Sequence, residues 1–154
     1  MSYKKPVSVL VVIHTPDLDI LLLERARHPG FWQSVTGSQE DGESLLQTAV
    51  REVREETGIV ATGPDMLDWQ QSNQFEIFQE WRHRYAPGVT HNEEHVFSLC
   101  VPNRAEPVRI APDEHVRARW LPWRDAAAAC FSWTNRDAIL ALPTKFQAQQ
   151  QGSD

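Results

Sequence analysis

Residues 37–59 constrain the fold of this chain most, because they encode both ends of a helix and its apolar face. Ser44 and Gln47 match a capping box, in which each side chain bonds a free backbone N–H at the start of the helix. Apolar residues then recur at helical spacing. Gly58 stands where a left-handed C-terminal cap belongs. The sequence therefore predicts a helix over residues 45–57.

Three glutamates share one face of this predicted helix. Glu52, Glu55 and Glu56 are three and four residues apart, so their side chains lie close together. Like charges at such spacings repel by roughly 0.2–0.5 kcal/mol per pair. Arg51 and Arg54 can supply part of the compensating charge, and a divalent metal can supply more. Oxygen ligands favour a hard cation, so we expect Mg²⁺, with Mn²⁺ as an alternative. The competing interpretation is a solvated acidic face.

The spacing of the other residues in this stretch decides between the two interpretations. It fits the pattern G-x5-E-x7-R-E-U-x-E-E-x-G-U, where U is aliphatic. The matching residues are Gly37, Glu43, Arg51, Glu52, Val53, Glu55, Glu56, Gly58 and Ile59. The stretch resembles the Nudix box at every defined position, and fixed spacing over so many residues makes the resemblance specific.

The resemblance implies a Nudix hydrolase, an enzyme that cleaves a nucleoside diphosphate linked to a further group. It implies an α/β fold, an α/β/α sandwich with a mixed β-sheet and a loop–helix–loop metal site. Glu52 and Glu56 fall at metal-ligand positions, and Glu55 is a further ligand or assists the base. Arg51 is expected to orient a box glutamate, with Glu43 as the candidate, through a charged hydrogen bond. Which glutamate is the general base is left open.

The rest of the chain is predicted to supply strands and two more helices. Residues 7–14 and 20–23 predict a hairpin. Extended segments are predicted over residues 31–37, 68–79, 80–85, 94–101 and 116–121, and helices over 122–131 and 133–142. This pattern favours a mixed sheet with helices packed on it. We expect residues 1–146 to form a single domain and residues 147–154 a disordered polar tail.

Composition limits the partners of such a domain. The formal net charge is −6, which argues against a protein that mainly grips nucleic acid phosphates. The apolar run Val9 to Ile13 is too short to cross a bilayer. Cys100 and Cys130 form no disulfide framework. We therefore expect a cytoplasmic protein without nucleic acid or membrane partners, and no oligomeric state is predicted. The small-molecule triphosphate substrate that we expect is implied by the resemblance and not by composition.

Basic residues outside the box are candidates for binding the phosphates. Arg25 and Arg27 share a strand face, and Arg82 and Arg84 are expected to share another. In an acidic protein such pairs can form a local positive pocket. Solvated surface arginines are the alternative.

A planar ring needs a surface for stacking and a group that reads its edge. Strand alternation places Phe75 and Ile77 on one face, and Glu76 and Phe78 on the other. A carboxylate such as Glu76 can accept two N–H bonds from the amino-amide edge of a pterin or a guanine, and a neighbouring aromatic ring can stack on it. Core packing of these aromatic rings is the alternative.

A second resemblance, from about residue 4 to residue 139, points to the Nudix enzymes of bacterial folate synthesis. It rests on residues 5–8, 31–37, 75–78, 82–90 and 132–136. It implies hydrolysis of 7,8-dihydroneopterin triphosphate to dihydroneopterin monophosphate and pyrophosphate, with side activity on dATP and other nucleoside triphosphates. The substrate positions that it implies are Lys4, Arg25, Thr36, Phe75, Glu76, Ile77, Phe78 and Ser132.

The same resemblance places Glu114 where a metal ligand outside the box is expected. Asp113, Glu93 and Glu94 are alternatives for that role. Two competing functions remain: a Nudix enzyme that cleanses the nucleotide pool, and a binding module that has lost catalysis. The second is disfavoured because no box carboxylate is missing.

Overall fold

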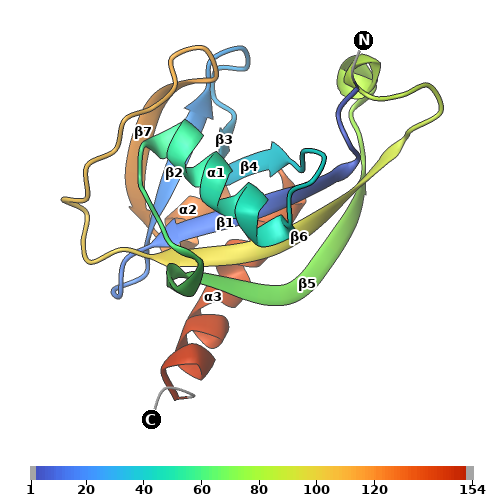
Figure 1. Cartoon of the computed structure of the whole chain (residues 1–154). Helices are drawn as coiled ribbons and strands as arrows, with labels where there is room; N and C mark the ends of the chain where they lie inside the picture. The colour runs from blue at the N-terminus through green and yellow to red at the C-terminus, as the bar shows by residue number, and fades with distance from the viewer. Residues whose placement is uncertain (1–2, 152–154) are drawn as a thin grey trace.

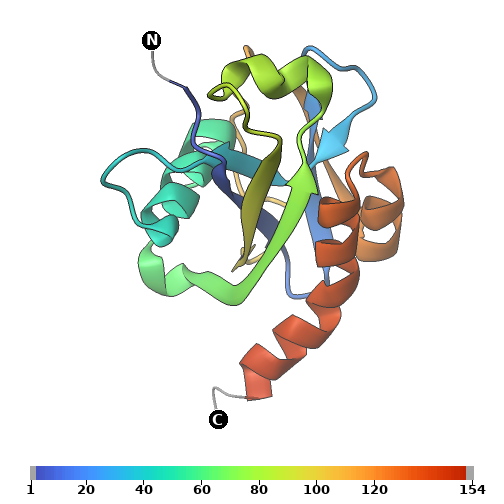
Figure 2. The same ribbon diagram turned by 90° about the vertical axis from the view of Figure 1, so that its right-hand side faces the viewer.

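The computed structural model describes residues 3–151 and shows three layers (Figure 1). A mixed sheet forms the middle layer. Helix α1 (Leu45–Thr57) covers one face of it, and helices α2 (Trp123–Ala129) and α3 (Trp133–Gln151) cover the other (Figure 2). The expected α/β/α sandwich is confirmed.

Within residues 3–151 the sheet contains seven strands, in the order β3-β2-β1-β6-β5, with β4 pairing β1 and β7 pairing β2. The strands are β1 (Val7–His14), β2 (Asp19–Arg25), β3 (Trp32–Gln33), β4 (Val35–Ser38), β5 (Met66–Glu76), β6 (His91–Cys100) and β7 (His115–Pro122). Strand β1 pairs in parallel with β6 and antiparallel with β2 and β4. The predicted β1–β2 hairpin and the mixed character of the sheet are therefore present.

Each face of the sheet has its own apolar core. On the α1 face, Val9 and Phe97 pack with Val53 of the helix. On the α3 face, Leu10 packs with Ile139. Successive residues of β1 serve opposite cores because side chains alternate along a strand. Burial on both faces explains why β1 is a nearly continuous aliphatic run.

The ends of α1 form as the sequence predicts. The Ser44 hydroxyl accepts from the backbone N–H of Gln47, and the Gln47 side chain accepts from the N–H of Ser44. Gly58 adopts a left-handed φ of 77° and donates to the carbonyl of Arg54. Both ends of the helix are thus fixed by local hydrogen bonds.

Residues 80–85 differ from the prediction, because the chain forms a 3₁₀ helix, η2 (Gln79–Arg84), instead of an extended segment. Strand β5 ends at Glu76, so the alternation does not extend to Phe78. The backbone is satisfied locally by i→i+3 bonds, such as the one from the Trp81 N–H to the Phe78 carbonyl. Arg82 and Arg84 therefore do not share a strand face.

Helix α3 is longer than predicted and extends into the expected disordered tail, as far as Gln151. Lys145 lies 5.6 Å from the centre of the Trp69 ring, and Phe146 packs edge-on against His14. The Gln and Ala residues that follow favour helix, so the helix continues beyond these contacts. Residues 152–154 of the expected tail lie outside the described part of the chain. Across residues 3–151, none of the helices combines the length and apolar character required to span a membrane.

Candidate active site

Arg51 organises the loop before α1 and the acidic face of the helix. Its guanidinium donates to both carboxylate oxygens of Glu43, to Glu52 Oε1 at 2.8 Å and to Glu55 Oε2 at 3.2 Å. A further bond of 3.0 Å reaches the backbone carbonyl of Ser38. Hydrogen bonding from Arg51 lowers the pKa of Glu43 to about 2. Arg51 and Glu43 therefore form a fixed ion pair that orients Glu52.

Glu52 and Glu56 lie one turn apart on α1 and point toward the sheet. Their carboxyl groups hydrogen-bond each other, and burial raises the pKa of both, most strongly that of Glu56. A Cβ atom at Gly37 of β4 would lie 2.0 Å from Glu52 Cδ, so only glycine leaves room for this carboxylate. Glu56 Oε1 is buried and has no hydrogen-bond partner. Arg51 balances part of the charge of this pair through Glu52, while Glu56 forms no ion pair with an arginine or lysine among the described residues.

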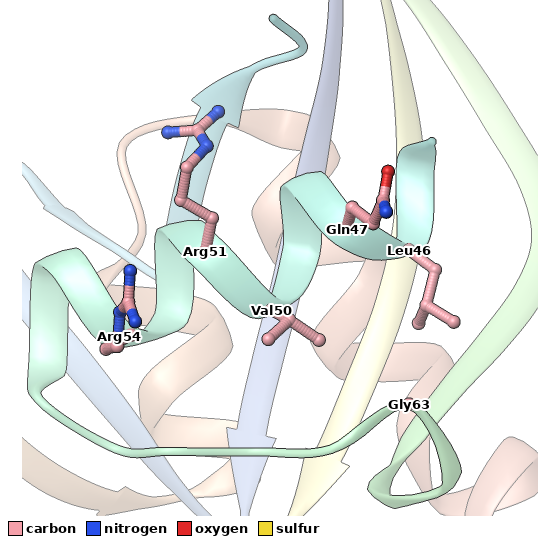
Figure 3. A pocket seen from close by; sticks show the side chains of 6 residues that line it. All are labelled: Leu46, Gln47, Val50, Arg51, Arg54 and Gly63. Carbon is pink, nitrogen blue, oxygen red and sulfur yellow. The ribbon is translucent and has the colours of Figure 1, made fainter. Parts of the chain in front are cut away.

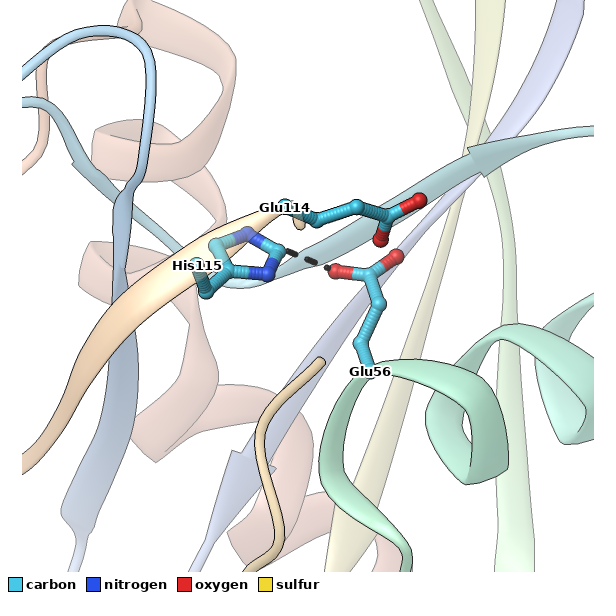
Figure 4. A group of neighbouring side chains, drawn as sticks. All are labelled: Glu56, Glu114 and His115. Carbon is cyan, nitrogen blue, oxygen red and sulfur yellow. Dashed lines mark ion pairs between the residues drawn. The ribbon is translucent and has the colours of Figure 1, made fainter. Parts of the chain in front are cut away.

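Glu114 and His115 complete the acidic cluster from the start of β7 (Figure 4). Together with Glu56 they offer ligand atoms that lie within 4.8 Å of one another. His115 Nε2 is 3.8 Å from Glu56 Oε1. Burial lowers the pKa of His115 to about 4, so the ring is neutral near pH 7 and does not balance the carboxylates.

The structure separates the other carboxylates from this cluster. Glu55 is half exposed and contacts Arg51 at the rim. Asp113 is exposed. Glu93 lies 3.2 Å from His95, and Glu94 is buried against Thr134 of α3, on the opposite face of the sheet from α1.

Three basic side chains gather beside the carboxylates. Lys4 is exposed and Arg25 is partly buried, and desolvation together with the nearby Arg84 charge lowers the pKa of each. The Lys4 backbone N–H donates to the Arg84 carbonyl at 2.9 Å, which ties the N-terminal segment to η2. Within residues 3–151, none of these three cations forms an ion pair. They therefore form a basic site that is free to bind phosphate.

Aromatic rings flank this basic site. The Arg25 guanidinium lies 4.7 Å from the centre of the Trp81 ring. Trp81 contacts Phe78 and Phe131, and Phe131 stacks on Phe31 with ring centres 4.6 Å apart. Phe78 is 46% exposed, so it offers an accessible ring face. We call Phe31, Phe78, Trp81 and Phe131 the aromatic cluster.

The remaining predicted substrate residues fall in different places. Thr36 bonds Glu56 through its backbone N–H, and its hydroxyl is 3.4 Å from Gln33 Nε2. Ser132 Oγ lies 2.9 Å from Thr134 Oγ1. Phe75 pairs with Asn92 of β6, and Ile77 is buried at the end of the same segment.

Glu76 lies apart from these residues. Its side chain is 67% exposed and accepts a 2.7 Å hydrogen bond from Arg82. The pair is exposed to solvent, and the contact of Glu76 with a substrate ring stays a prediction.

Sequence reasoning did not single out Gln33 or His115. Gln33 Oε1 accepts from Arg25 at 3.3 Å, and its amide group reaches His115, so it connects the basic site with the acidic cluster. His115 could have been suspected from the sequence because it directly follows Glu114, a predicted metal ligand.

A groove on the outer face of α1 shares Arg51 with the site but extends away from it. Its walls come from Leu46, Gln47, Val50, Arg51, Arg54 and Gly63 (Figure 3). These residues include no carboxylate, so the groove offers no anionic ligand to a cation.

Residues 4–142 match the model of the NUDIX domain family. The chain is 49% identical over 140 residues to the dihydroneopterin triphosphate diphosphatase of Escherichia coli K12, covering 89% of this chain and 91% of that protein. It is 40% identical over 142 residues to the diphosphatase of the same name from Haemophilus influenzae, covering 90% and 88%. A solved structure of the E. coli dihydroneopterin triphosphate pyrophosphohydrolase superposes with a TM-score of 0.83 at 46% identity, covering 90% of this chain and 95% of that one.

Proposed function

Because the chain belongs to the NUDIX domain family, we propose that it hydrolyses dihydroneopterin triphosphate to dihydroneopterin monophosphate and pyrophosphate. The observation that carries this proposal is the basic site of Lys4, Arg25 and Arg84 next to the carboxylates of Glu52 and Glu56. A triphosphate matches the free cations, and the acidic cluster beside them suits a metal-assisted hydrolysis. The E. coli relative, whose name states this substrate, is 49% identical to the chain.

We propose Mg²⁺ as the metal, with Glu52, Glu56 and Glu114 holding it. Two features fit a cation there: the buried Glu56 Oε1 without a partner, and the space at Gly37 that Glu52 occupies. Carboxylate oxygens favour Mg²⁺ or Mn²⁺ over softer metals. When bound, the cation would neutralise phosphate oxygens and lower the pKa of a bound water.

The protein's own residues would position the substrate. Lys4 and Arg84 hold phosphate oxygens, and Arg25 is fixed for the same task by Trp81 and Gln33. Bidentate arginine contacts orient a phosphate as well as attract it. A box glutamate accepts the proton of the attacking water, and Glu55 is our candidate because it is half exposed and shares Arg51 with Glu52.

Product analysis tests this proposal. Purified protein with Mg²⁺ is incubated separately with dihydroneopterin triphosphate, dATP and GTP, and the products are separated by chromatography. We expect pyrophosphate and the monophosphate, formed fastest from the pterin, with slower cleavage of dATP. Fast cleavage of nucleotides alone would favour the enzyme that cleanses the nucleotide pool. No cleavage of any substrate would favour the binding module.

We also propose a cytoplasmic location, without nucleic acid or membrane partners. Cys100 and Cys130 are both free thiols, which fits a reducing compartment. The net charge of −6 opposes contact with nucleic acid.

A further inference from the structure

Gln33 is a buried amide side chain between the basic site and the acidic cluster. It is 4% exposed and lies on β3, where it pairs with Leu23 of β2. Cross-strand partners share a face of the sheet, and so do residues two apart on one strand. Leu23 packs in the core on the α1 face, so the side chains of Gln33 and Arg25 also point toward that face. The register of β2 and β3 therefore brings the amide group to Arg25.

The two ends of this amide group have different neighbours. Its oxygen, Oε1, accepts a 3.3 Å hydrogen bond from Arg25 Nη1. Its nitrogen, Nε2, lies 3.4 Å from the Thr36 hydroxyl and 3.5 Å from His115 Nε2. An amide nitrogen only donates and an amide oxygen only accepts. Thr36 and His115 therefore hold the donor end, which directs the acceptor end to Arg25.

Arg25 is held by two groups that carry no charge. One is the Gln33 amide, and the other is the Trp81 ring, whose centre lies 4.7 Å from the guanidinium carbon. Burial and the nearby Arg84 lower the pKa of Arg25, but a guanidinium stays protonated in proteins. Across residues 3–151, Arg25 forms no ion pair. Its positive charge is therefore fixed in position and is not neutralised by a bonded carboxylate.

Arg51 shows what a charged partner does to an arginine in this protein. Its guanidinium forms ion pairs with Glu43 and Glu52, so its charge is balanced within the protein. A carboxylate at position 33 would hold Arg25 as firmly as the amide does, but it would compete with a phosphate for the same guanidinium. A neutral acceptor keeps the geometry and leaves the charge available.

We propose that Gln33 is a positioning residue for phosphate binding, which holds the Arg25 guanidinium in place without neutralising its charge. This inference rests on the proposed function, in which Arg25 binds the triphosphate. A guanidinium that is already oriented loses less side-chain freedom when it binds a phosphate. Gln33 therefore increases the affinity for the phosphates, and it does so for every triphosphate regardless of the ring.

Binding of inorganic triphosphate, measured by calorimetry in the presence of EDTA, tests the proposal without catalysis. Gln33→Met keeps the length of the side chain and removes the acceptor, so the Kd should rise by about 10-fold. Gln33→Glu keeps the acceptor and adds a charge. At pH 8 the new carboxylate should pair with Arg25, as Glu43 pairs with Arg51, and the Kd should rise by about 100-fold. Gln147→Met is the matched control at an exposed position of α3, and it should leave the Kd unaltered.

A double-mutant cycle separates positioning of Arg25 from a general structural role. Arg25→Met weakens binding by itself, and adding Gln33→Met should change the Kd by less than about 2-fold further, because Gln33 acts through Arg25. Kinetics with dihydroneopterin triphosphate and Mg²⁺ give a second readout. Gln33→Met should raise KM by about 10-fold and lower kcat by less than about 3-fold. Partial loss of the fold would instead reduce the amount of active enzyme, and so lower kcat at an unchanged KM.

Additive effects in the cycle, or a wild-type Kd in Gln33→Glu, would overturn the proposal, and so would a wild-type protein that does not bind inorganic triphosphate. The proposed function fails separately, if wild type does not cleave the pterin; the binding measurements then still test Gln33. If Gln33→Met does not fold, Gln33→Asn replaces it, because the shorter amide cannot reach Arg25. A similar rise of the Kd supports the proposal, and wild-type affinity of Gln33→Asn overturns it.

Discussion

Glu43 and Glu94 are both shielded from water, yet their electrostatic situations are opposite. Arg51 bonds both oxygens of Glu43 and lowers its pKa to about 2. Glu94 has one contact with Thr134, one free oxygen and a pKa of about 7. Both oxygens of Glu43 bond Arg51, so this carboxylate holds the loop before α1 to the helix. In Glu94, one carboxylate oxygen has no hydrogen-bond partner in the described part of the chain.

The same contrast separates the two faces of the sheet. On the α1 face, Arg51 fixes the carboxylates that would carry the reaction on any triphosphate. On the α3 face, Glu94 lies away from these carboxylates and bonds Thr134. We therefore expect changes on the α1 face to alter rates for all substrates together, and changes at Glu94 to alter stability.

Glu56→Gln should have the largest effect. It keeps the size of the side chain and removes the charge of a proposed metal ligand, so kcat should fall by about 10³-fold or more for every substrate. The ratio of pterin to dATP cleavage should stay constant, and Mg²⁺ affinity, measured by titration, should fall. Wild-type turnover at saturating Mg²⁺ would show that the acidic cluster is not the reaction centre.

Gly37→Ala should come next, because its Cβ would meet Glu52 Cδ at 2.0 Å and displace that carboxylate. We expect kcat to fall by about 10²-fold with unchanged ring selectivity, since this displacement affects the α1 face. Gly42→Ala is the matched control. An added Cβ at position 42 has no atom within 4 Å, so the change creates no clash. The φ of Gly42 is 79°, a conformation that alanine adopts at a cost of about 1 kcal/mol of stability. Equal loss of activity in both variants would refute the steric explanation.

The pH dependence of stability should separate Glu94 from Glu43. Because the folded-state pKa of Glu94 is raised to about 7, the unfolded chain releases this proton first, and stability falls as pH rises from about 4.5 to 7. Glu94→Gln removes this loss. Its stability relative to wild type, from urea unfolding, should therefore increase by roughly 2–3 kcal/mol between pH 4 and pH 8.

The contribution of Glu43 to folding stability changes with pH in the opposite direction from that of Glu94, and it does so in a lower pH range. Its folded-state pKa is about 2, so its stabilising contribution is complete above the unfolded value and is lost only as pH falls toward 2. Parallel stability curves for wild type and Glu94→Gln from pH 4 to pH 8 would mean that Glu94 is not buried in the state that we describe.

Ser44→Ala should have the smallest effect. It removes one half of the capping box of α1, which typically costs about 1 kcal/mol. Thermal unfolding should show a small decrease in Tm, while the kcat/KM ratios among substrates stay at their wild-type values. A change in selectivity would contradict the separation of the two faces.

The parts that the sequence predicted well are those that local interactions determine. Helix α1 has its caps and its apolar face within one stretch, so its bounds were predicted to the residue. The η2 helix was missed, and its Trp81 contacts Phe131, a residue distant in the chain. No local sequence pattern predicts a contact between residues so far apart in the chain.

The position of Glu94 was missed for a related reason. Glu94 was considered only as an alternative metal ligand, because its position relative to α1 depends on the register of β6 against β1. Alternation along residues 75–78 suggested Glu76 for the ring edge, but β5 ends there and the side chain faces solvent. Register and strand ends follow from tertiary packing, which a single sequence does not reveal.

The parallel ladder of β1 and β6 also determines when a nascent chain can first become active. It joins Val7 to Glu93, and such long-range closure is slow compared with local folding. Lys4 must then meet Arg84, and Ser34 must meet Asn135. An incomplete chain that ends before α3 would therefore carry the whole box, with its capped helix, but would lack the helix that bonds Ser34 and covers the other face of the sheet. A functional fold would therefore form only after the last third of the protein has been synthesised, and not when the box alone is complete.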